Sequence, residues 1–233
     1  MKILAVSDIE LGLIYSPQIA KRFSDIDLVI GCGDVPYYYL EYIISMLDVP
    51  LYFVRGNHAS QSEWGTGEER HFPWGAVDLH RRSAQDESGL ILAGIEGSVR
   101  YNFGDHQYTQ AEMWGLAYWI AIQLMANKIR YGRYLDILVT HAPPWKIHDM
   151  DDLPHHGIKA FNWLIKVFKP IYHLHGHVHV YRSDTIIETH MGGTRVVNTY
   201  GYRELIISKQ ELAARSLAPR PRSRGEKFYE SKP

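Results

Sequence analysis

The sequence predicts an α/β fold with a largely parallel sheet, in which short buried strands alternate with helices. Three apolar runs occur within the first sixty residues, at 2–6, 27–30 and 51–55, and helix signals separate them. None of the runs alternates polar with apolar residues, which is typical of strands covered on both faces. Polar donor residues follow each run, as expected where α/β sheets place chemistry at the carboxyl ends of their strands. We expect right-handed crossovers between these strands.

The segments between these runs carry helix and loop signals. Pro17 stands at a favourable first helical position and predicts a short helix to about residue 23, whereas Pro36 begins a helix that continues through residue 47. Residues 60–76 mix glycine and proline with tryptophan and charged side chains, which predicts a long surface loop. Two interpretations of this loop stay open: it forms a wall of a substrate cleft, or it is a decorated connection.

The alternation continues in the second half of the chain. Apolar runs predict strands at 90–95 and 136–140. Between them, residues 109–129 form the longest helix candidate. Thr109 is its expected N-cap, and Glu112 stands three residues on as the capping-box partner. We expect its stripe of Met, Trp and Leu residues to pack in the core rather than to line a cofactor site.

The pattern changes after a further helix, which is predicted over 157–168 and ended by Pro170. Short β runs follow at 184–190, 194–199 and 204–208, joined by tight turns. Runs of this kind predict antiparallel hairpins that complete a second sheet.

Composition and charge narrow the class of protein. The chain has 233 residues, 45% hydrophobic content and a formal net charge of −1, as expected of a soluble globular protein. The balanced charge gives no global field for polymeric nucleic acid or an anionic membrane. Cys32 is the only cysteine, so no internal disulfide can form. No signal-peptide pattern and no membrane span are evident, so we expect a cytoplasmic protein.

Two regions are expected along the chain. Residues 1–210 form one domain, since no linker interrupts them. Residues 211–233 form a basic, proline-containing tail that we expect to be disordered or loosely docked. The sequence leaves the oligomeric state open.

The stretch from His173 to His179 indicates a metal site, because His177 and His179 are two residues apart and both imidazoles can reach one small volume. Two imidazoles cannot complete such a site, so further ligands are needed. Donors do follow four other predicted strands, in the segments Asp8-Ile9-Glu10, Gly33-Asp34, Gly56-Asn57-His58 and His141.

These segments, in this order, resemble the five motifs of the calcineurin-like metallophosphoesterases, and the resemblance runs from Met1 to about Tyr202. The last motif is Gly176-His177-Val178-His179. Two residues depart from the family pattern. Glu10 occupies the place of a ligand histidine, and Ala59 replaces an acidic residue after His58.

The resemblance implies a four-layer sandwich of two stacked mixed β-sheets flanked by helices. It also implies two divalent metal ions, most simply Mn²⁺, with Mg²⁺, Fe²⁺ or Zn²⁺ as alternatives. The ligands it assigns are Asp8, Glu10 and His179 for one metal, Asn57, His141 and His177 for the other, and Asp34 as the bridge. His58 would protonate the leaving oxygen, or it is a structural histidine with its hydrogen bonds satisfied within the fold. With Glu10 the set holds three carboxylates, which favours harder ions at the first position.

The implied activity is hydrolysis of a small phosphodiester or phosphomonoester, and the aromatic loop at 60–76 makes a nucleotide a reasonable substrate. Two further residues are candidates for substrate binding. The guanidinium of Arg100 can clamp a phosphate oxygen, or it forms a structural ion pair. His156 lies in the donor-rich segment 145–157, which is either substrate-facing or a solvated polar loop.

Two other functions stay open. The departures at Glu10 and Ala59 would suit a non-catalytic module that binds metal or phosphate without turnover. A mononuclear oxygenase with histidine and carboxylate ligands needs only three protein ligands. It would leave Asn57, His141 and one carboxylate without a role.

Overall fold

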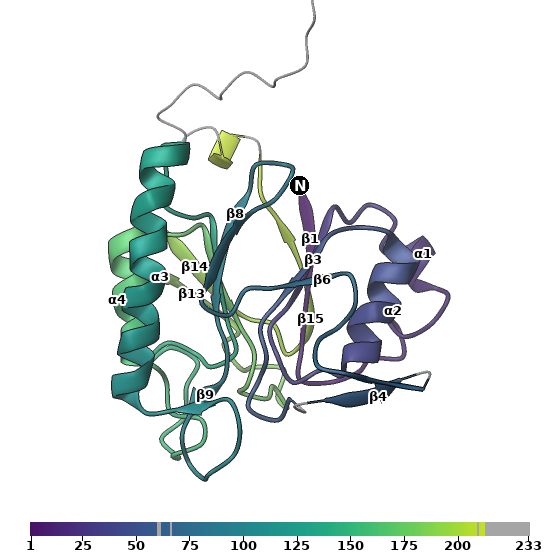
Figure 1. Ribbon diagram of the computed structural model, residues 1–233, viewed down its shortest axis with the longest axis horizontal. Helices are drawn as coiled ribbons and strands as arrows, with labels where there is room; N and C mark the ends of the chain where they lie inside the picture. The colour runs from purple at the N-terminus through teal and green to yellow at the C-terminus, as the bar shows by residue number, and fades with distance from the viewer. Residues whose placement is uncertain (60–61, 66, 209, 213–233) are drawn as a thin grey trace, which may run out of the picture.

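Two central sheets lie face to face in the computed structural model, and helices cover their outer faces (Figure 1). The structure describes residues 1–59, 62–65, 67–208 and 210–212. The predicted four-layer α/β sandwich is therefore confirmed. Among the described residues, no helix combines the length and the apolar character needed to cross a membrane.

The first sheet has the strand order β15-β1-β2-β3-β6. Its strands are β15 (Gly201–Ile206), β1 (Lys2–Ser7), β2 (Leu28–Gly31), β3 (Leu51–Phe53) and β6 (Ala76–Asp78). The last four are parallel, and β15 pairs with β1 in the antiparallel sense. The outer face of this sheet is covered by α1 (Ile19–Arg22) and α2 (Tyr37–Leu47).

The second sheet has the order β13-β14-β12-β11-β8-β7. Its strands are β13 (Glu188–Met191), β14 (Thr194–Asn198), β12 (Tyr172–His175), β11 (Ile137–Thr140), β8 (Ile91–Ile95) and β7 (Arg82–Gln85). The four inner strands are parallel, and the two edge strands are antiparallel to their neighbours. The helices α3 (Gln110–Tyr131) and α4 (Lys159–Phe168) cover its outer face.

Apolar side chains fill three separate layers, because each inner strand sends alternate residues to opposite faces. Between the sheets, Ile3 and Ile30 of the first sheet meet Leu92, Val139 and Leu174 of the second. The other faces of the same strands pack against the helices. This placement explains why the strands appear in the sequence as continuous apolar runs.

The predicted start of α3 is confirmed by its capping geometry. The Thr109 side chain accepts a hydrogen bond from the backbone N–H of Glu112, and the Glu112 carboxylate accepts one from the backbone N–H of Thr109. Gly132 ends the helix with a φ of 76°, a left-handed conformation that glycine adopts without steric cost.

The predicted hairpins after residue 184 are only partly present. β13 and β14 form an antiparallel pair, but β14 is parallel to β12, and β15 leaves the second sheet to pair with β1. Thr199 lies at the point where the chain crosses between the sheets, and its hydroxyl bonds to Ser7 Oγ at 3.0 Å. Local turn signals cannot show which sheet supplies a partner for the last strand, so the assignment to a second sheet was wrong for β15.

The segment predicted as a long loop contains secondary structure. β4 (Glu63–Gly65) and β5 (Glu68–Arg70) form a small hairpin before β6. The Arg70 guanidinium pairs with the Glu41 carboxylate of α2 and lies 4.2 Å over the ring of Trp74. A second small pair is β9 (Ser98–Val99) with β10 (Gln107–Tyr108). The predicted basic tail at 211–233 lies outside the described residues, except for 211 and 212.

Candidate metal centre

The polar donors gather where the carboxyl ends of five parallel strands meet at one edge of the two sheets. Asp8 follows β1, Asp34 follows β2, Asn57 follows β3, His141 follows β11 and His177 follows β12. Asp8, Asp34 and His177 have positive φ values of 68°, 53° and 69°. Such backbone conformations are strained outside glycine and concentrate at functional sites.

Two positions in the motifs require glycine, because the backbone there passes too close to a carboxylate of the site for any Cβ atom to fit. A Cβ atom at Gly56 would lie 1.9 Å from Asp34 Oδ1, and one at Gly176 would lie 2.6 Å from Asp8 Oδ2. Any side chain at either position would therefore displace a carboxylate of the site. The glycines of Gly56-Asn57 and Gly176-His177 thus let the backbone pass directly beside the donors.

At the centre of the site, acceptor atoms face one another. His141 Nε2 lies 3.0 Å from Asn57 Oδ1, 3.1 Å from Asp34 Oδ2 and 3.1 Å from His177 Nδ1. The other nitrogen of each imidazole faces a backbone carbonyl: His141 Nδ1 lies 2.9 Å from Cys32 O, and His177 Nε2 lies 2.7 Å from Pro154 O. Each of these nitrogens therefore donates its proton to a carbonyl, as metal-ligating histidines do.

This donor set fits a cation. In the neutral tautomers that the two carbonyls select, His141 Nε2 and His177 Nδ1 are both bare lone pairs, next to a carboxylate oxygen and an amide oxygen. Asp34, His141 and His177 each place a ligand atom within 4.8 Å of the other two. Asp8 Oδ2 is buried without a hydrogen-bond partner at the same edge, whereas Asp8 Oδ1 accepts a bond from the His177 N–H at 2.9 Å.

The pKa shifts of Asp34 and His141 also indicate that positive charge is favoured at the centre of the site. Burial alone would raise the pKa of Asp34, but attraction to His141 and hydrogen bonds from His141 and the His58 N–H lower it to about 2. Burial would lower the pKa of His141, but Asp34 and Asp8 raise it to about 9. Without a cation, a proton on His141 supplies the positive charge that the two carboxylates require, and binding of a metal ion would release this proton.

Two predicted ligands lie at the margin of this cluster. Glu10 is exposed, and its carboxylate accepts a 2.6 Å hydrogen bond from the Tyr38 hydroxyl, which raises the pKa of Tyr38 to about 12. His179 is also exposed, and its Nδ1 lies 2.7 Å from the Tyr181 hydroxyl. His179 nevertheless lines the same cavity as Asp34, Asn57 and His177.

The structure separates the other candidates into two groups. His58 lines the cavity with an exposed side chain, and its backbone N–H donates to Asp34 Oδ1 at 2.9 Å. Arg100 instead forms a 3.0 Å ion pair with Glu112 at the start of α3, and it is not among the residues that line the cavity. His156 is likewise not among them, whereas its neighbour His155 is.

Sequence reasoning missed two contributors to the cavity. The Tyr101 hydroxyl accepts a 3.1 Å hydrogen bond from Asn57 Nδ2, which turns the Asn57 oxygen towards His141. Pro154 supplies the backbone carbonyl that orients His177. Neither carries a motif, since a tyrosine in a short loop and a backbone carbonyl have no sequence signal. Only the neighbouring donor-rich segment, with His155 in it, pointed to this loop.

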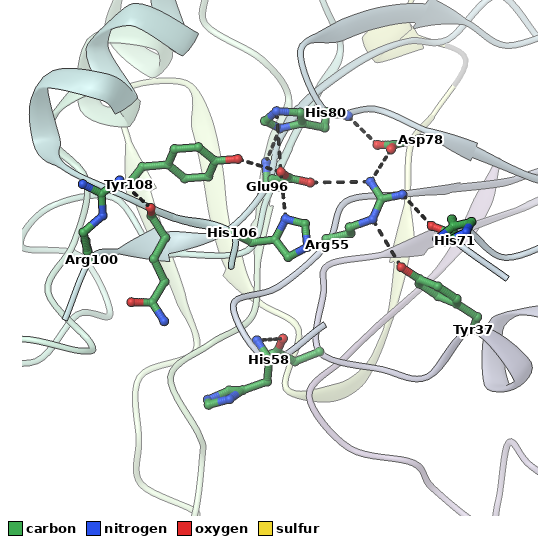
Figure 2. A network of polar contacts seen from close by, with 12 residues as sticks. Tyr37, Arg55, His58, His71, Asp78, His80, Glu96, Arg100, His106 and Tyr108 are labelled. Atoms are coloured by element: carbon green, nitrogen blue, oxygen red, sulfur yellow. Dashed lines mark hydrogen bonds and ion pairs between the residues drawn. The ribbon is translucent and has the colours of Figure 1, made fainter. Parts of the chain in front are cut away.

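A partly buried polar network supports the loop that carries Asn57 and His58. Figure 2 shows Arg55, immediately before Gly56, bonded to Asp78, to the Tyr37 hydroxyl at 3.3 Å and to the His71 carbonyl at 3.1 Å. Arg55 Nη1 also lies 3.6 Å from the buried carboxylate of Glu96, which follows β8. His58 and Arg100 lie apart from this cluster in the same view. The network therefore anchors the chain just after β3, immediately before Gly56 and Asn57.

Lowering the pH is expected to destabilise the fold through buried histidines such as His173. Burial lowers the pKa of His173 from 6.5 to about 3, and the Thr140 hydroxyl bonds to its Nε2 at 2.8 Å. In the unfolded chain, His173 is therefore protonated below about pH 6.5, whereas in the folded protein it stays neutral down to about pH 3. At pH 5 this one group lowers the free energy of unfolding by about 2 kcal/mol.

Urea unfolding at pH 7 and pH 5 measures this effect, with His173→Leu compared against the exposed His190→Leu as control. The pH dependence should weaken in His173→Leu and stay unchanged in His190→Leu. Equal pH dependence in both variants would contradict the assignment.

Comparisons with known proteins agree with this architecture. Residues 1–181 match the calcineurin-like phosphoesterase family. One solved structure shares 15% sequence identity with a TM-score of 0.58, covering 88% of this chain and 94% of the other. The protein TT1561 of Thermus thermophilus shares 15% identity with a TM-score of 0.55, covering 86% of this chain and 89% of that one. No curated protein matches the chain in sequence.

The two stacked sheets, with carboxylate, amide and imidazole donors at their shared edge, define a metal-binding α/β protein. The match over residues 1–181 is more specific: the chain belongs to the calcineurin-like phosphoesterase family. The family implies a metal-dependent phosphoesterase in general, with a dinuclear centre of divalent ions. The two solved structures support the fold alone.

Proposed function

We propose that the protein is a dinuclear metal phosphoesterase that hydrolyses small phosphodiesters in preference to phosphomonoesters. One observation supports the metal chemistry most directly. His141 Nε2 and His177 Nδ1 face each other at 3.1 Å. The other nitrogen of each ring donates a hydrogen bond to a backbone carbonyl. Two imidazole lone pairs at this distance repel each other unless a cation or a proton lies between them.

In this proposal, Asn57, His141 and His177 would hold one ion, Asp8, Glu10 and His179 would hold the other, and Asp34 would contribute to both. When bound, the two ions would supply an activated water nucleophile and would stabilise the charge on the attacking and leaving oxygens. Mn²⁺ is the proposed native ion, because three carboxylates in the set favour a hard cation. Cys32 O and Pro154 O keep the ligand rings in orientation, and Tyr101 does so for Asn57.

His58 is the proposed proton donor to the leaving oxygen. Its side chain lines the cavity together with Asp34, and its backbone N–H donates to Asp34 Oδ1 at 2.9 Å. A group in this position can protonate an alkoxide as it departs. Ala59 follows it, so the next residue offers no carboxylate to orient the ring.

The lining of the cavity supports the preference for diesters. The cavity has a volume of about 240 Å³, and its lining residues are Asp34, Asn57, His58, Tyr101, Pro154, His155, His177 and His179. Neither arginine nor lysine is among these residues, so charge neutralisation would rest on the metal ions. A diester carries one negative charge and a monoester about two at neutral pH, so a lining without fixed cations favours the diester. The described residues of the aromatic segment 60–76, which suggested a nucleotide, are not among the lining residues, so the proposed class is small phosphodiesters in general. Neither a membrane nor a nucleic-acid polymer is a proposed partner.

The experiment is hydrolysis of bis-p-nitrophenyl phosphate and p-nitrophenyl phosphate by metal-stripped protein reconstituted with Mn²⁺, Mg²⁺, Zn²⁺ or Fe²⁺. We expect metal-dependent turnover with a higher kcat/KM for the diester. A higher kcat/KM for the monoester would overturn the substrate preference only. Two ions bound per chain without turnover of either substrate would overturn the phosphoesterase and favour a non-catalytic binding module.

Replacing Glu10 by histidine is expected to move the metal preference from Mn²⁺ towards Zn²⁺. The change removes one anionic ligand and adds a softer one, so the site becomes more electropositive and its bound water more acidic. Metal content after reconstitution in an equimolar Mn²⁺ and Zn²⁺ mixture, together with the pH midpoint of activity, measures the shift. Tyr38→Phe is the matched control, because it removes the 2.6 Å hydrogen bond to Glu10 and keeps the carboxylate. If Glu10→His matches the wild type in both measurements, Glu10 does not ligate.

A further inference from the structure

The long helix α3 has two apolar faces, whereas a helix on the surface of a globular protein ordinarily has one. Its inner face packs on the second sheet through Met113, Ala117, Ile120 and Leu124, all fully buried. Its outer face carries Tyr118, Ile122, Met125 and Ile129, which are 55%, 68%, 53% and 89% exposed. Large apolar side chains gathered on one exposed face mark an interaction surface.

The outer residues follow a regular spacing. Ala111, Gly115, Tyr118, Ile122, Met125 and Ile129, here called the α3 stripe, are separated by four, three, four, three and four residues. All six are exposed. This is the spacing of the a and d positions of a coiled coil, at which one helix packs along another. The stripe therefore fits a helix, and it extends for about 27 Å along α3.

The stripe is complementary to the same stripe on a second copy of α3 that runs in the opposite direction. If two copies of α3 run antiparallel and cross at Ile120, Ala111 meets Ile129 of the second copy, Gly115 meets its Met125, and Tyr118 meets its Ile122. At both ends a small residue thus lies opposite a large one. Gly115 has open space above it, since a Cβ built there has no neighbour within 4 Å. A patch that pairs with itself in this way is the signature of a two-fold symmetric interface.

Charge favours the same orientation. The first turn of α3 carries Glu112 and the last turn carries Lys128 and Arg130. An antiparallel pair brings the acidic end of each helix beside the basic end of the other, and it opposes the two helix dipoles. A parallel pair would place like charges side by side. The Glu112 side chain is 48% exposed, although its carboxylate also pairs with Arg100 at 3.0 Å.

We propose that the protein forms a two-fold symmetric homodimer in which α3 packs antiparallel against α3 of a second copy. The interface lies on the outer face of the second sheet's helix layer, and the metal centre lies at the carboxyl edge of the strands. Dimer formation buries the most exposed apolar side chains of α3 and leaves the cavity of the site open. This inference does not depend on the proposed activity.

Sedimentation equilibrium of the full chain, from about 1 to 200 µM, tests the dimer. We expect a mass that rises from 26.9 kDa towards twice that value as concentration increases. Ile122→Glu should abolish the rise, because it places two carboxylates within the seam. Met125→Glu provides a second variant, and Ile186→Glu, at a residue 70% exposed elsewhere, is the matched control that should still dimerise. A monomer at every concentration, or a dimer that Ile122→Glu leaves intact, overturns the proposal.

Cysteine pairs test the orientation. Ala111→Cys with Ile129→Cys in one chain should give a disulfide-linked dimer on mild oxidation, because each thiol faces the other position of the second copy. Ile129→Cys alone should stay unlinked, since its two thiols lie at opposite ends of an antiparallel seam. The native Cys32 is buried and does not interfere. Cross-linking of Ile129→Cys alone would show a parallel pair and overturn the proposed arrangement.

Discussion

Replacing Asp34 by asparagine is expected to lower metal-dependent hydrolysis by about a thousand-fold or more. Asp34 is the proposed bridging carboxylate: its Oδ2 lies 3.1 Å from His141 Nε2, and its Oδ1 accepts the His58 N–H at 2.9 Å. Asparagine keeps the shape and replaces one anionic oxygen by an amide nitrogen that cannot ligate. The bridging position then lacks both a ligand atom and a negative charge.

Metal content and kcat/KM for bis-p-nitrophenyl phosphate, measured on the same samples, separate loss of metal from loss of chemistry. We expect Asp34→Asn to retain fewer than two ions per chain. Asp48→Asn is the matched control, because Asp48 is exposed at the end of α2 with a φ of 51°, a conformation that asparagine also adopts readily. Activity within ten-fold of the wild type in Asp34→Asn would show that this residue does not bridge the metals.

Replacing Glu96 by alanine is expected to lower the free energy of unfolding by about 3 to 5 kcal/mol. The Glu96 side chain is 5% exposed, and its Oε1 accepts bonds from the Tyr108 hydroxyl at 2.7 Å and from His106 Nδ1 at 3.0 Å. Burial would raise the pKa of Glu96, but these donors and His80 lower it to about 2. Removal of the carboxylate leaves its partly buried donors without this acceptor and removes one of the two anions that face Arg55.

Urea unfolding with and without the substitution measures this loss. Asp184→Ala is the control, because it removes the carboxylate of an ion pair with Arg182 whose side chains are 66% and 78% exposed. Screening by solvent makes such a pair nearly neutral to stability, so the control should unfold at the wild-type urea concentration. If Glu96→Ala unfolds there too, the network does not stabilise the fold.

Glu96→Ala also tests whether the network positions the metal ligands in addition to stabilising the fold. Arg55 precedes Gly56 and Asn57, so loosening of its anchors should displace Asn57 from His141. We expect weaker Mn²⁺ binding in Glu96→Ala at a temperature where the variant is still fully folded. Wild-type affinity under these conditions would restrict Glu96 to a structural role.

The alternation of strands and helices was predictable because a strand that is buried on both faces appears in the sequence as a continuous apolar run. β1, β2 and β11 are continuous apolar runs, and each is fully enclosed between a helix layer and the opposite sheet. The capping box of α3 is equally local, since Thr109 and Glu112 are three residues apart. β15 was placed in the wrong sheet because its partner, β1, lies about 200 residues away in sequence, and no turn signal reports such a pairing.

Some residues of the site were also predictable from the sequence, whereas the position of others was decided only by the tertiary structure. Asp34, Asn57, His141 and His177 were identified from their positions after strands, and the parallel topology brings these ends together. Arg100 was a candidate for phosphate binding, but its partner is Glu112, because α3 begins beside the loop that carries it. His155 rather than His156 lines the cavity, since adjacent residues in a loop point in different directions.

The sequence by itself determined the fold class, the family resemblance and the order of the donor residues, because each of these rests on residue types at short spacing. Only the tertiary structure decided which donors share one volume, which carbonyls fix the imidazole tautomers, and where Glu10 and Arg100 find their partners. It also showed that α3 has a second, exposed apolar face, the α3 stripe, in addition to the predicted core stripe, whose Met113 and Leu124 are buried. An apolar helical periodicity looks the same whether it faces a sheet or solvent, and only the packing of the chain distinguishes the two.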